Sequence, residues 1–177
     1  MKKQLNDILV NCNITSTRGD MDKNIHAIVF DSRKATSDSV FVAIRGVQAD
    51  GHSYIAAVIE NGCSVIISEE AIEVPANCTL IVTPNTSETL AVMATNFYEH
   101  PSKKLNLIGI TGTNGKTTST TLLFNLYKKL GFHCGLLSTV VNKIGDRAIA
   151  STHTTPDPVS LNQLLAEMVE DGCSHCF

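Results

Sequence analysis

The sequence has 177 residues, a length between one average domain and two, and its 43% hydrophobic and 18% charged residues exclude a disordered or fibrous chain. Its 14 Lys and Arg stand against 17 Asp and Glu, which gives a net charge of −3. This balance lacks the basic field that binding to a nucleic-acid backbone needs, so we expect no nucleic-acid partner.

The first hundred residues alternate strand-like and helix-like segments. Short apolar, β-branched runs predict four strands, at residues 25–30, 40–44, 64–68 and 79–82. A helix between the second and third strands carries Tyr54, Ala57 and Val58 and ends at Asn61-Gly62. Another helix begins at residues 86–88, and its inward face holds Leu90, Met93, Ala94 and Phe97. These elements predict a small α/β domain.

A polar stretch at residues 100–104 contains Pro101, which stops a helix, and a new strand follows it. We therefore predict two domains, at residues 1–100 and 101–177. The second domain begins with a strand at 105–111, a glycine loop, a helix at 117–130 capped by Gly131, and a strand at 134–141. This strand–helix–strand order predicts a parallel sheet.

The rest of the second domain predicts a turn at 142–147 around Gly145-Asp146, a polar loop at 151–158, and a helix that ends at Gly172. The helix carries an apolar stripe at Leu161, Leu164, Leu165, Met168 and Val169. Residues 173–177 begin a further strand. A parallel sheet of about two strands does not bury both faces, so we expect a fragment of a longer protein. The alternative is a complete protein whose last strand lies at a sheet edge.

The glycine loop consists of Gly112, Thr113, Asn114, Gly115, Lys116, Thr117 and Thr118. In a P-loop, backbone N–H groups and a helix N-terminus surround phosphate oxygens, a Lys neutralises the terminal phosphates, and the next hydroxyl binds Mg²⁺. Lys116 and Thr117 occupy those two positions, which predicts a nucleoside triphosphate ligand. The loop departs from the general pattern at Ile110, where Gly is usual. An ordinary glycine-rich turn is the alternative.

Several motifs together resemble the Mur ligase family. Residues 111–118 resemble the ATP loop of Mur ligases and of their folyl-polyglutamate synthetase relatives. Asp31-Ser32-Arg33, with residues 40–43 and 46–52, resembles the UDP-binding domain of the Mur ligases that add the third residue or the final dipeptide. Folyl-polyglutamate synthetases lack that domain. Thr154-Thr155-Pro156 resembles the members that add the third residue, the UDP-N-acetylmuramoyl-tripeptide synthetases.

The resemblance implies an α/β fold, in which a small UDP-binding domain precedes the truncated start of a P-loop, parallel-sheet ATPase domain. It implies an ATP-dependent peptide ligase of peptidoglycan synthesis that acts on UDP-MurNAc-L-Ala-D-Glu and a free amino acid. ATP would phosphorylate the D-glutamate side-chain carboxylate, and the amine of the amino acid would attack the acyl phosphate. The family's further magnesium ligand, modified lysine and amino-acid-selecting domain would follow residue 177. We therefore expect the chain to bind its ligands without turnover, and the sequence does not identify the amino acid.

The resemblance also assigns roles to individual residues. Lys116 and Thr117 are the expected catalytic residues, Thr117 is the expected magnesium ligand, and residues 112–118 bind ATP. The expected substrate-binding residues are Ser32, Gln48, Ala49, Thr154 and Thr155. The chain departs from the family at His153, where many members carry Asn, and at Val47, a variable position where only the backbone would serve.

The residues alone leave simpler roles open. Asp31 and Ser32 could form a turn between strands, and Asp50-Gly51 is a common turn dipeptide beside an exposed Gln48. Spacing alone favours Thr154-Thr155 as an N-terminal helix cap. Three alternative functions also remain: a dipeptide-adding Mur ligase, a P-loop kinase or switch GTPase with an accessory first domain, and a non-enzymatic nucleotide-binding module.

The longest apolar run, residues 40–44, is far shorter than the roughly 18 residues of a membrane helix, and no signal-peptide pattern is present. We expect a cytoplasmic monomer whose six cysteines are reduced. Cys173-Ser174-His175-Cys176 supplies too few ligands for a zinc site on its own, so we interpret its cysteines as buried structural residues. His26, His52, His100 and His133 show no ligand spacing and are assigned no chemistry.

Overall fold

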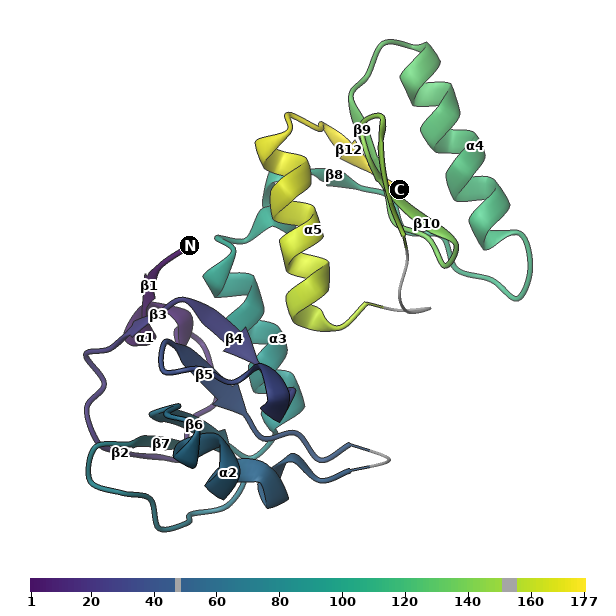
Figure 1. The fold of residues 1–177 in the computed structure, drawn as a ribbon. Helices are drawn as coiled ribbons and strands as arrows, with labels where there is room; N and C mark the ends of the chain where they lie inside the picture. Colours follow the sequence, from purple (N-terminus) through teal and green to yellow (C-terminus); the bar gives the residue numbers. More distant parts are fainter. Residues whose placement is uncertain (47–48, 151–155) are drawn as a thin grey trace. The chain divides into compact units, whose positions relative to one another are not determined.

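The computed structural model describes residues 1–46, 49–150 and 156–177, and the chain divides into two units, Met1–Phe97 and Tyr98–Phe177 (Figure 1). The sequence places this division between His100 and Pro101. No helix in the described ranges combines the length and the apolar character that crossing a membrane requires.

The first unit is built on a five-stranded sheet in the order β2-β7-β6-β5-β4. Its strands are β2 (Ser16–Arg18), β4 (Ala27–Val29), β5 (Ser39–Val42), β6 (Val65–Ser68) and β7 (Thr79–Val82). The four predicted strands are present as β4 to β7, and all four run parallel. The sequence analysis missed β2, which pairs antiparallel with β7, because its three residues are polar and exposed. It also missed the short pair β1 (Lys3–Gln4) and β3 (Asn24–Ile25).

Three α-helices belong to this unit within the described residues: α1 (Leu5–Ile8), α2 (Ile55–Glu60) and α3 (Thr86–Phe97). Ile55 and Val58 of α2 pack on Phe41, Ile66 and Leu80 of the sheet. The predicted inward face of α3 is buried, with Leu90, Met93, Ala94 and Phe97 at most 3% exposed. Two short 3₁₀ helices, η1 (Ser32–Lys34) and η2 (Gly51–Tyr54), follow the carboxyl ends of β4 and β5 along the chain.

The second unit contains a five-stranded sheet in the order β11-β10-β9-β12-β8. The strands are β8 (Asn106–Leu107), β9 (Cys134–Leu136), β10 (Val141–Ile144), β11 (Arg147–Ala150) and β12 (His175–Cys176). The strands β8, β12 and β9 pair in parallel, as the strand–helix–strand order predicts, and the sheet continues with the antiparallel β10 and β11. The expected strand at 134–141 is present as the shorter β9. It ends at Leu136 because the Ser138 hydroxyl donates to the Val141 carbonyl oxygen at 2.7 Å, and the chain reverses into β10.

The predicted turn at 142–147 is confined to Gly145-Asp146, and the residues around it form an antiparallel hairpin. The predicted strand at 105–111 is shorter, because β8 pairs only with the two residues of β12. These strands also correct the estimate of a two-stranded sheet, on which the expectation of a fragment was based.

The two long helices of this unit, α4 (Lys116–Lys129) and α5 (Pro158–Glu170), cover opposite faces of its sheet (Figure 1). Phe124 of α4 packs on Phe177, whereas Leu165 and Met168 of α5 pack on the neighbouring Cys176. Neighbouring residues of a strand face opposite sides, which explains this division. Asp157 caps α5 by accepting hydrogen bonds from the N–H groups of Val159 and Ser160, at 3.0 and 2.9 Å. Asp157 thus occupies the cap position, and Thr154-Thr155, for which spacing alone favours a cap, lies outside the described residues.

Candidate functional site

The glycine loop of the second unit leads directly into α4. Gly115 is the residue before the helix and has a φ of +83°, a conformation that side chains with a Cβ rarely adopt. No side chain of the described residues caps this helix, so the N–H groups of its first turn are not used by a cap. An uncapped helix start after a glycine loop fits the geometry that binds phosphate oxygens.

Lys116 lies across this loop. Its ammonium group donates to the carbonyl oxygen of Gly112 and, at 3.3 Å, to that of Thr113. The positive charge of Lys116 therefore lies on the loop that leads into α4, next to the N–H groups that are available to an anion. Thr113, Asn114 and Thr118 are exposed around it, so the loop presents an open polar surface.

A pocket of about 360 Å³ opens beside the loop and is lined by Lys116, Thr117, Leu137 and Thr139, among others. The hydroxyl oxygens of Thr117 and Thr139 lie 3.3 Å apart. Paired oxygen atoms next to a phosphate-binding loop suit Mg²⁺, which binds oxygen ligands and usually retains several waters. The sequence analysis missed Thr139, because it lies 22 residues after Thr117 and belongs to no recognised motif.

A second pocket, of about 570 Å³, lies in the first unit at the carboxyl ends of β4 and β5. Phe30, Asp31, Ser32 and Arg33 line one part of it, and Ile44, Gly46, Ala49, Gly51 and Tyr54 line the rest. The structure thus brings together Ser32 and Ala49, two of the predicted substrate-binding residues. In an open parallel sheet, ligands bind at the carboxyl ends of the strands, as this pocket does.

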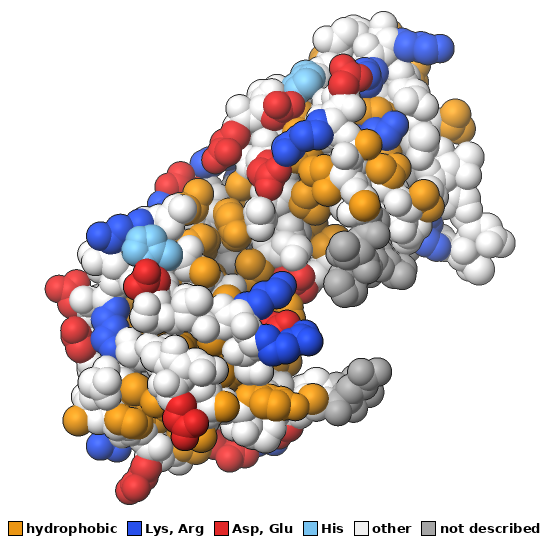
Figure 2. Space-filling view, viewed as in Figure 1, with side chains coloured by type: hydrophobic (Ala, Val, Ile, Leu, Met, Phe, Trp, Pro, Cys, Tyr) orange, Lys and Arg blue, Asp and Glu red, His pale blue; other side chains and the backbone are white. Residues whose placement is uncertain are grey.

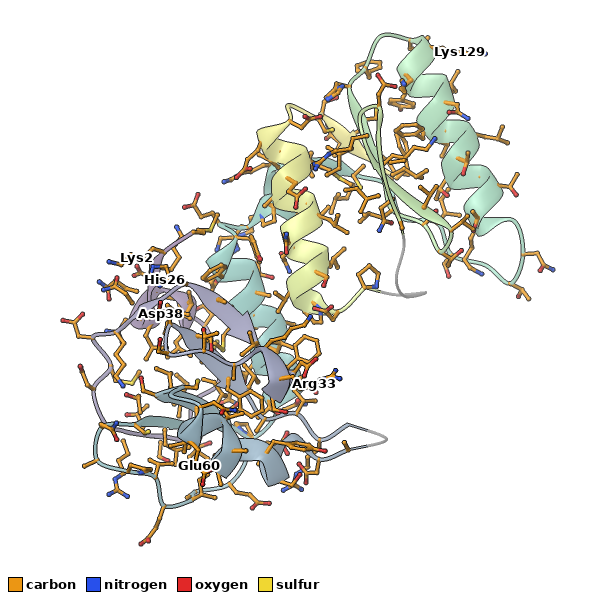
Figure 3. The ribbon with its side chains drawn as sticks, viewed as in Figure 1. Lys2, His26, Arg33, Asp38, Glu60 and Lys129 are labelled. Carbon is orange, nitrogen blue, oxygen red and sulfur yellow. The ribbon has the colours of Figure 1, made fainter. Side chains whose placement is uncertain are left out.

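The Asp31-Ser32 segment also forms a turn, as the simpler interpretation expected. Asp31 caps η1 by accepting from the N–H of Arg33 at 3.1 Å, and its carboxylate pairs with the Arg33 guanidinium at 2.9 and 2.8 Å. The hydrogen bond from the Arg33 side chain lowers the pKa of Asp31 to about 2. The Arg33 side chain remains 87% exposed and extends outward beyond the end of β4 (Figure 3). The turn and the pocket wall are therefore the same structure.

Phe30, Arg33 and Tyr54 are among the lining residues that the sequence analysis did not predict as site residues. Phe30 and Tyr54 are 38% and 44% exposed, so neither ring belongs to the buried core. The available signal was the position of Phe30 and Arg33 on either side of Asp31-Ser32. Figure 2 shows acidic and basic side chains intermixed over the visible faces of both units.

Three predicted substrate-binding residues, Gln48, Thr154 and Thr155, lie outside the described residues, as do the family departures Val47 and His153. For these positions the predictions of the sequence analysis stand as predictions.

The cysteines are all free, and every one except Cys12 is buried. Burial raises the pKa of the Cys176 thiol to about 12 and also raises that of Cys173, which disfavours the thiolate that reactivity or metal binding requires. The His175 ring packs on Tyr127, with ring centroids 4.9 Å apart. The ring nitrogen of His133, a carboxylate oxygen of Asp171 and the Sγ of Cys173 do lie within 4.8 Å of one another. Sequence spacing did not reveal this grouping. His133 and Asp171 pair at 2.7 Å.

The fold and the glycine loop define an α/β protein with a P-loop in its second unit. The family profile described as the Mur ligase family catalytic domain matches residues 24–98, and the Mur ligase middle domain matches residues 110–177. Together these stretches make up most of the sequence, and the chain belongs to the Mur ligase family.

Individual relatives agree with this assignment. A UDP-N-acetylmuramoyl-L-alanyl-D-glutamate–2,6-diaminopimelate ligase from Cytophaga hutchinsonii is 51% identical over 98% of this chain, which covers 36% of that protein. The chain thus spans about a third of the length of the curated relatives it matches.

Solved structures also match the fold. A UDP-N-acetylmuramoyl-L-alanyl-D-glutamate–2,6-diaminopimelate ligase matches 99% of this chain and 35% of its own, with a TM-score of 0.76 and 23% identity. A MurF ligase from Thermotoga maritima in complex with ADP matches 77% of this chain and 29% of its own, with a TM-score of 0.53 and 27% identity. The α/β fold predicted from the sequence is confirmed.

Proposed function

We propose that this chain is part of an ATP-dependent ligase that adds an amino acid to UDP-MurNAc-L-Ala-D-Glu during synthesis of peptidoglycan precursors. Residues 1–100 bind the UDP end of the substrate, and residues 101–177 begin the ATP-binding domain. The observation that carries this proposal is 51% identity, across both units, to a ligase named for that substrate. The P-loop residues Lys116 and Thr117 agree with this proposal.

The pocket of the first unit has the chemistry that a uridine diphosphate needs. Phe30 and Tyr54 offer aromatic faces on which a pyrimidine ring can stack. Ser32 supplies a hydroxyl and the exposed Arg33 a positive charge for the diphosphate. Ala49, with Gln48 beside it in sequence, completes the binding set in this proposal.

The glycine loop of the second unit holds the ATP phosphates. Backbone N–H groups at the start of α4 donate to phosphate oxygens, and Lys116 neutralises their charge. The Thermotoga maritima relative with bound ADP supports an adenine nucleotide as the ligand. Thr117, with Thr139 beside it, would hold Mg²⁺, which supplies further neutralisation of charge on the phosphates.

The reaction needs activation because a carboxylate is a poor electrophile. Its oxygen attacks the terminal phosphorus of ATP, the bond to ADP breaks, and an acyl phosphate forms. The amine of the amino acid then attacks the acyl carbon, phosphate leaves with the bonding electrons, and the amine loses a proton. Lys116 stabilises the charge on the transferring phosphoryl group, so catalysis rests on positioning and electrostatics. Thr154 and Thr155 are proposed to donate hydroxyl hydrogen bonds to the substrate near this carboxylate.

The names of the relatives support 2,6-diaminopimelate as the amino acid. The dipeptide-adding alternative has a similar fold, since a 2,6-diaminopimelate–D-alanyl-D-alanyl ligase from Acinetobacter baumannii matches this chain with a TM-score of 0.55, but the 51% identity favours addition of the third residue.

A substitution at Lys116 tests the nucleotide site. We expect Lys116→Ala to weaken Mg·ATP binding by about tenfold or more, since a charge-assisted contact contributes about 1.5–3 kcal/mol. Calorimetric titration measures it. Lys129→Ala is the matched control, because Lys129 is an exposed lysine at the far end of the same helix (Figure 3). Equal ATP affinity in wild type and Lys116→Ala would contradict the proposal.

A further inference from the structure

The wall of the UDP pocket that follows β5 is made of two chain segments, residues 44–46 and 49–51, which we call the loop arms. Arg45 and Asp50 pair as an antiparallel bridge between them. The N–H of Gly51 donates to the Ile44 carbonyl oxygen at 2.8 Å, and the N–H of Gly46 donates to that of Ala49 at 2.9 Å. The arms therefore form a narrow two-stranded ladder.

The two sides of this ladder differ. Among the described residues, Ile44, Gly46, Ala49 and Gly51 line the pocket, whereas the intervening Arg45 and Asp50 do not. Alternation of this kind is expected of extended chain, whose successive residues face opposite ways. The arms thus present one row of residues to the pocket and another row away from it.

The row away from the pocket belongs to a polar cluster of Arg45, Asp50, His52, Glu69 and Thr86, which we call the loop-base cluster. The Arg45 guanidinium lies 3.3 Å from the Glu69 carboxylate. Glu69 in turn accepts from both the N–H and the hydroxyl of Thr86, each at 3.0 Å. This links the first arm to the residue after β6 and to the first residue of α3.

His52 links the second arm to the same place. The N–H of Glu69 donates to its Nε2 at 3.0 Å, and a backbone N–H can only donate, so Nε2 must be the unprotonated nitrogen. Nδ1 therefore carries the proton and donates to the Asp50 carboxylate at 2.7 Å. The His52 side chain is only 10% exposed, whereas the Asp50 side chain is 51% exposed.

The charge states in this cluster agree with its geometry. Hydrogen bonds from the His52 backbone lower the pKa of Asp50, and hydrogen bonds from the Thr86 backbone lower that of Glu69. Both carboxylates thus remain charged opposite Arg45. None of the cluster members is among the described residues that line the pocket.

We propose that Arg45, Asp50, His52 and Glu69 are positioning residues that hold the loop arms in the shape that binds uridine diphosphate. This inference rests on the proposed UDP-binding function. It extends that function to side chains that do not touch the pocket and that sequence motifs did not assign.

The test is calorimetric titration of the 177-residue chain with UDP. We expect His52→Leu to weaken UDP binding about three- to tenfold, the effect of one or two hydrogen bonds. His52→Gln should restore most of it, since an amide oxygen can accept from the Glu69 N–H while its NH₂ donates. The matched control is His26→Leu, because His26 faces Asp38 at 4.0 Å at the opposite end of β4 (Figure 3). Binding of Mg·ATP should be unchanged in all three variants.

Hydrogen exchange supplies a second readout. In His52→Leu the amides of Gly46 and Gly51 should exchange faster, and in His52→Gln they should not. Wild-type affinity in His52→Leu, equal loss in His52→Gln, or equal loss in His26→Leu would overturn the inference while leaving the UDP site intact. Failure of the wild-type chain to bind UDP would instead overturn the proposed function and the inference with it.

Discussion

The Asp31–Arg33 pair shows how one short motif serves two purposes at the residue scale. Asp31 caps η1, and Arg33, whose guanidinium it holds, lines the pocket proposed to bind UDP. The motif therefore fixes the backbone and the charge distribution of the pocket wall together. Because the Arg33 side chain is 87% exposed, we expect the pair to contribute little to stability and assign it mainly a role in positioning charge.

This pair has a testable dependence on pH. The pKa of Asp31 is lowered from 3.8 to about 2, so folding favours the ionised carboxylate. Its contribution to the free energy of unfolding is fully present above about pH 3.8. This contribution to stability is lost as the pH falls through about 2, where the folded-state carboxylate becomes protonated. Titration of the Asp31 carboxyl carbon by NMR should show this low value, and Arg33→Ala should move it upward toward 3.8. An unchanged value in Arg33→Ala would show that the side-chain pair does not cause the shift.

Residue roles were predictable only where a motif carried them. The loop sequence predicts roles for Lys116 and Thr117, the neighbours of Ser32 predict a role for Ser32, and all three stay predictions. No motif predicts a role for Thr139, Tyr54 or His52, because each joins its site through chain reversals that bring distant residues together. His52 in particular was assigned no chemistry, since its partners, Asp50 and the Glu69 backbone, form no ligand spacing.

At the scale of elements, buried strands and amphipathic helices were predicted well. Periodicity reports burial directly, which explains why β4 to β7 and the inner face of α3 were found. The missed elements leave no signal in the pattern of apolar residues. Exposed β2 has no apolar pattern, and the reversal before β10 depends on a Ser138 side-chain hydrogen bond within an apolar run. Because this reversal between β9 and β10 was not predicted, the change from parallel to antiparallel pairing in the second sheet was not predicted either.

Gly115 is a position where the structure of an element depends on one backbone angle, because its positive φ precedes the first turn of α4. We expect Gly115→Ala to destabilise the second unit by about 1 kcal/mol, the cost of a left-handed residue with a Cβ, and to weaken Mg·ATP binding. Urea unfolding and calorimetry measure the two effects. Gly109→Ala is the control, because an added Cβ there also meets no atom within 4 Å but its φ is not positive. Equal effects of the two substitutions would contradict a role for the angle.

At the scale of the whole molecule, each of the two units is proposed to bind a different ligand. The first carries the pocket for a UDP-linked substrate, and the second carries the P-loop for ATP. The curated relatives are about three times as long, so the proposed activity belongs to a longer ligase than residues 1–177. The comparisons agree with the expectation that this stretch belongs to such a protein.

This division predicts binding without turnover. Incubation of residues 1–177 with Mg·ATP, UDP-MurNAc-L-Ala-D-Glu and 2,6-diaminopimelate should yield no tripeptide product above background, as mass spectrometry would measure. The physical reason is that, in this proposal, the domain that selects the amino acid lies outside residues 1–177. Measurable product would show that the two units suffice for catalysis.

The most direct test of the central proposal is calorimetric titration of the chain with UDP-MurNAc-L-Ala-D-Glu, repeated with Ser32→Ala. We predict saturable binding to the wild-type chain that weakens by about three- to tenfold in the variant, the effect of one lost hydrogen bond. Retained Mg·ATP affinity in Ser32→Ala would show that the second unit is unaffected. Binding of Mg·ATP with no binding of the UDP-linked substrate to the wild-type chain would contradict the assignment of the first unit.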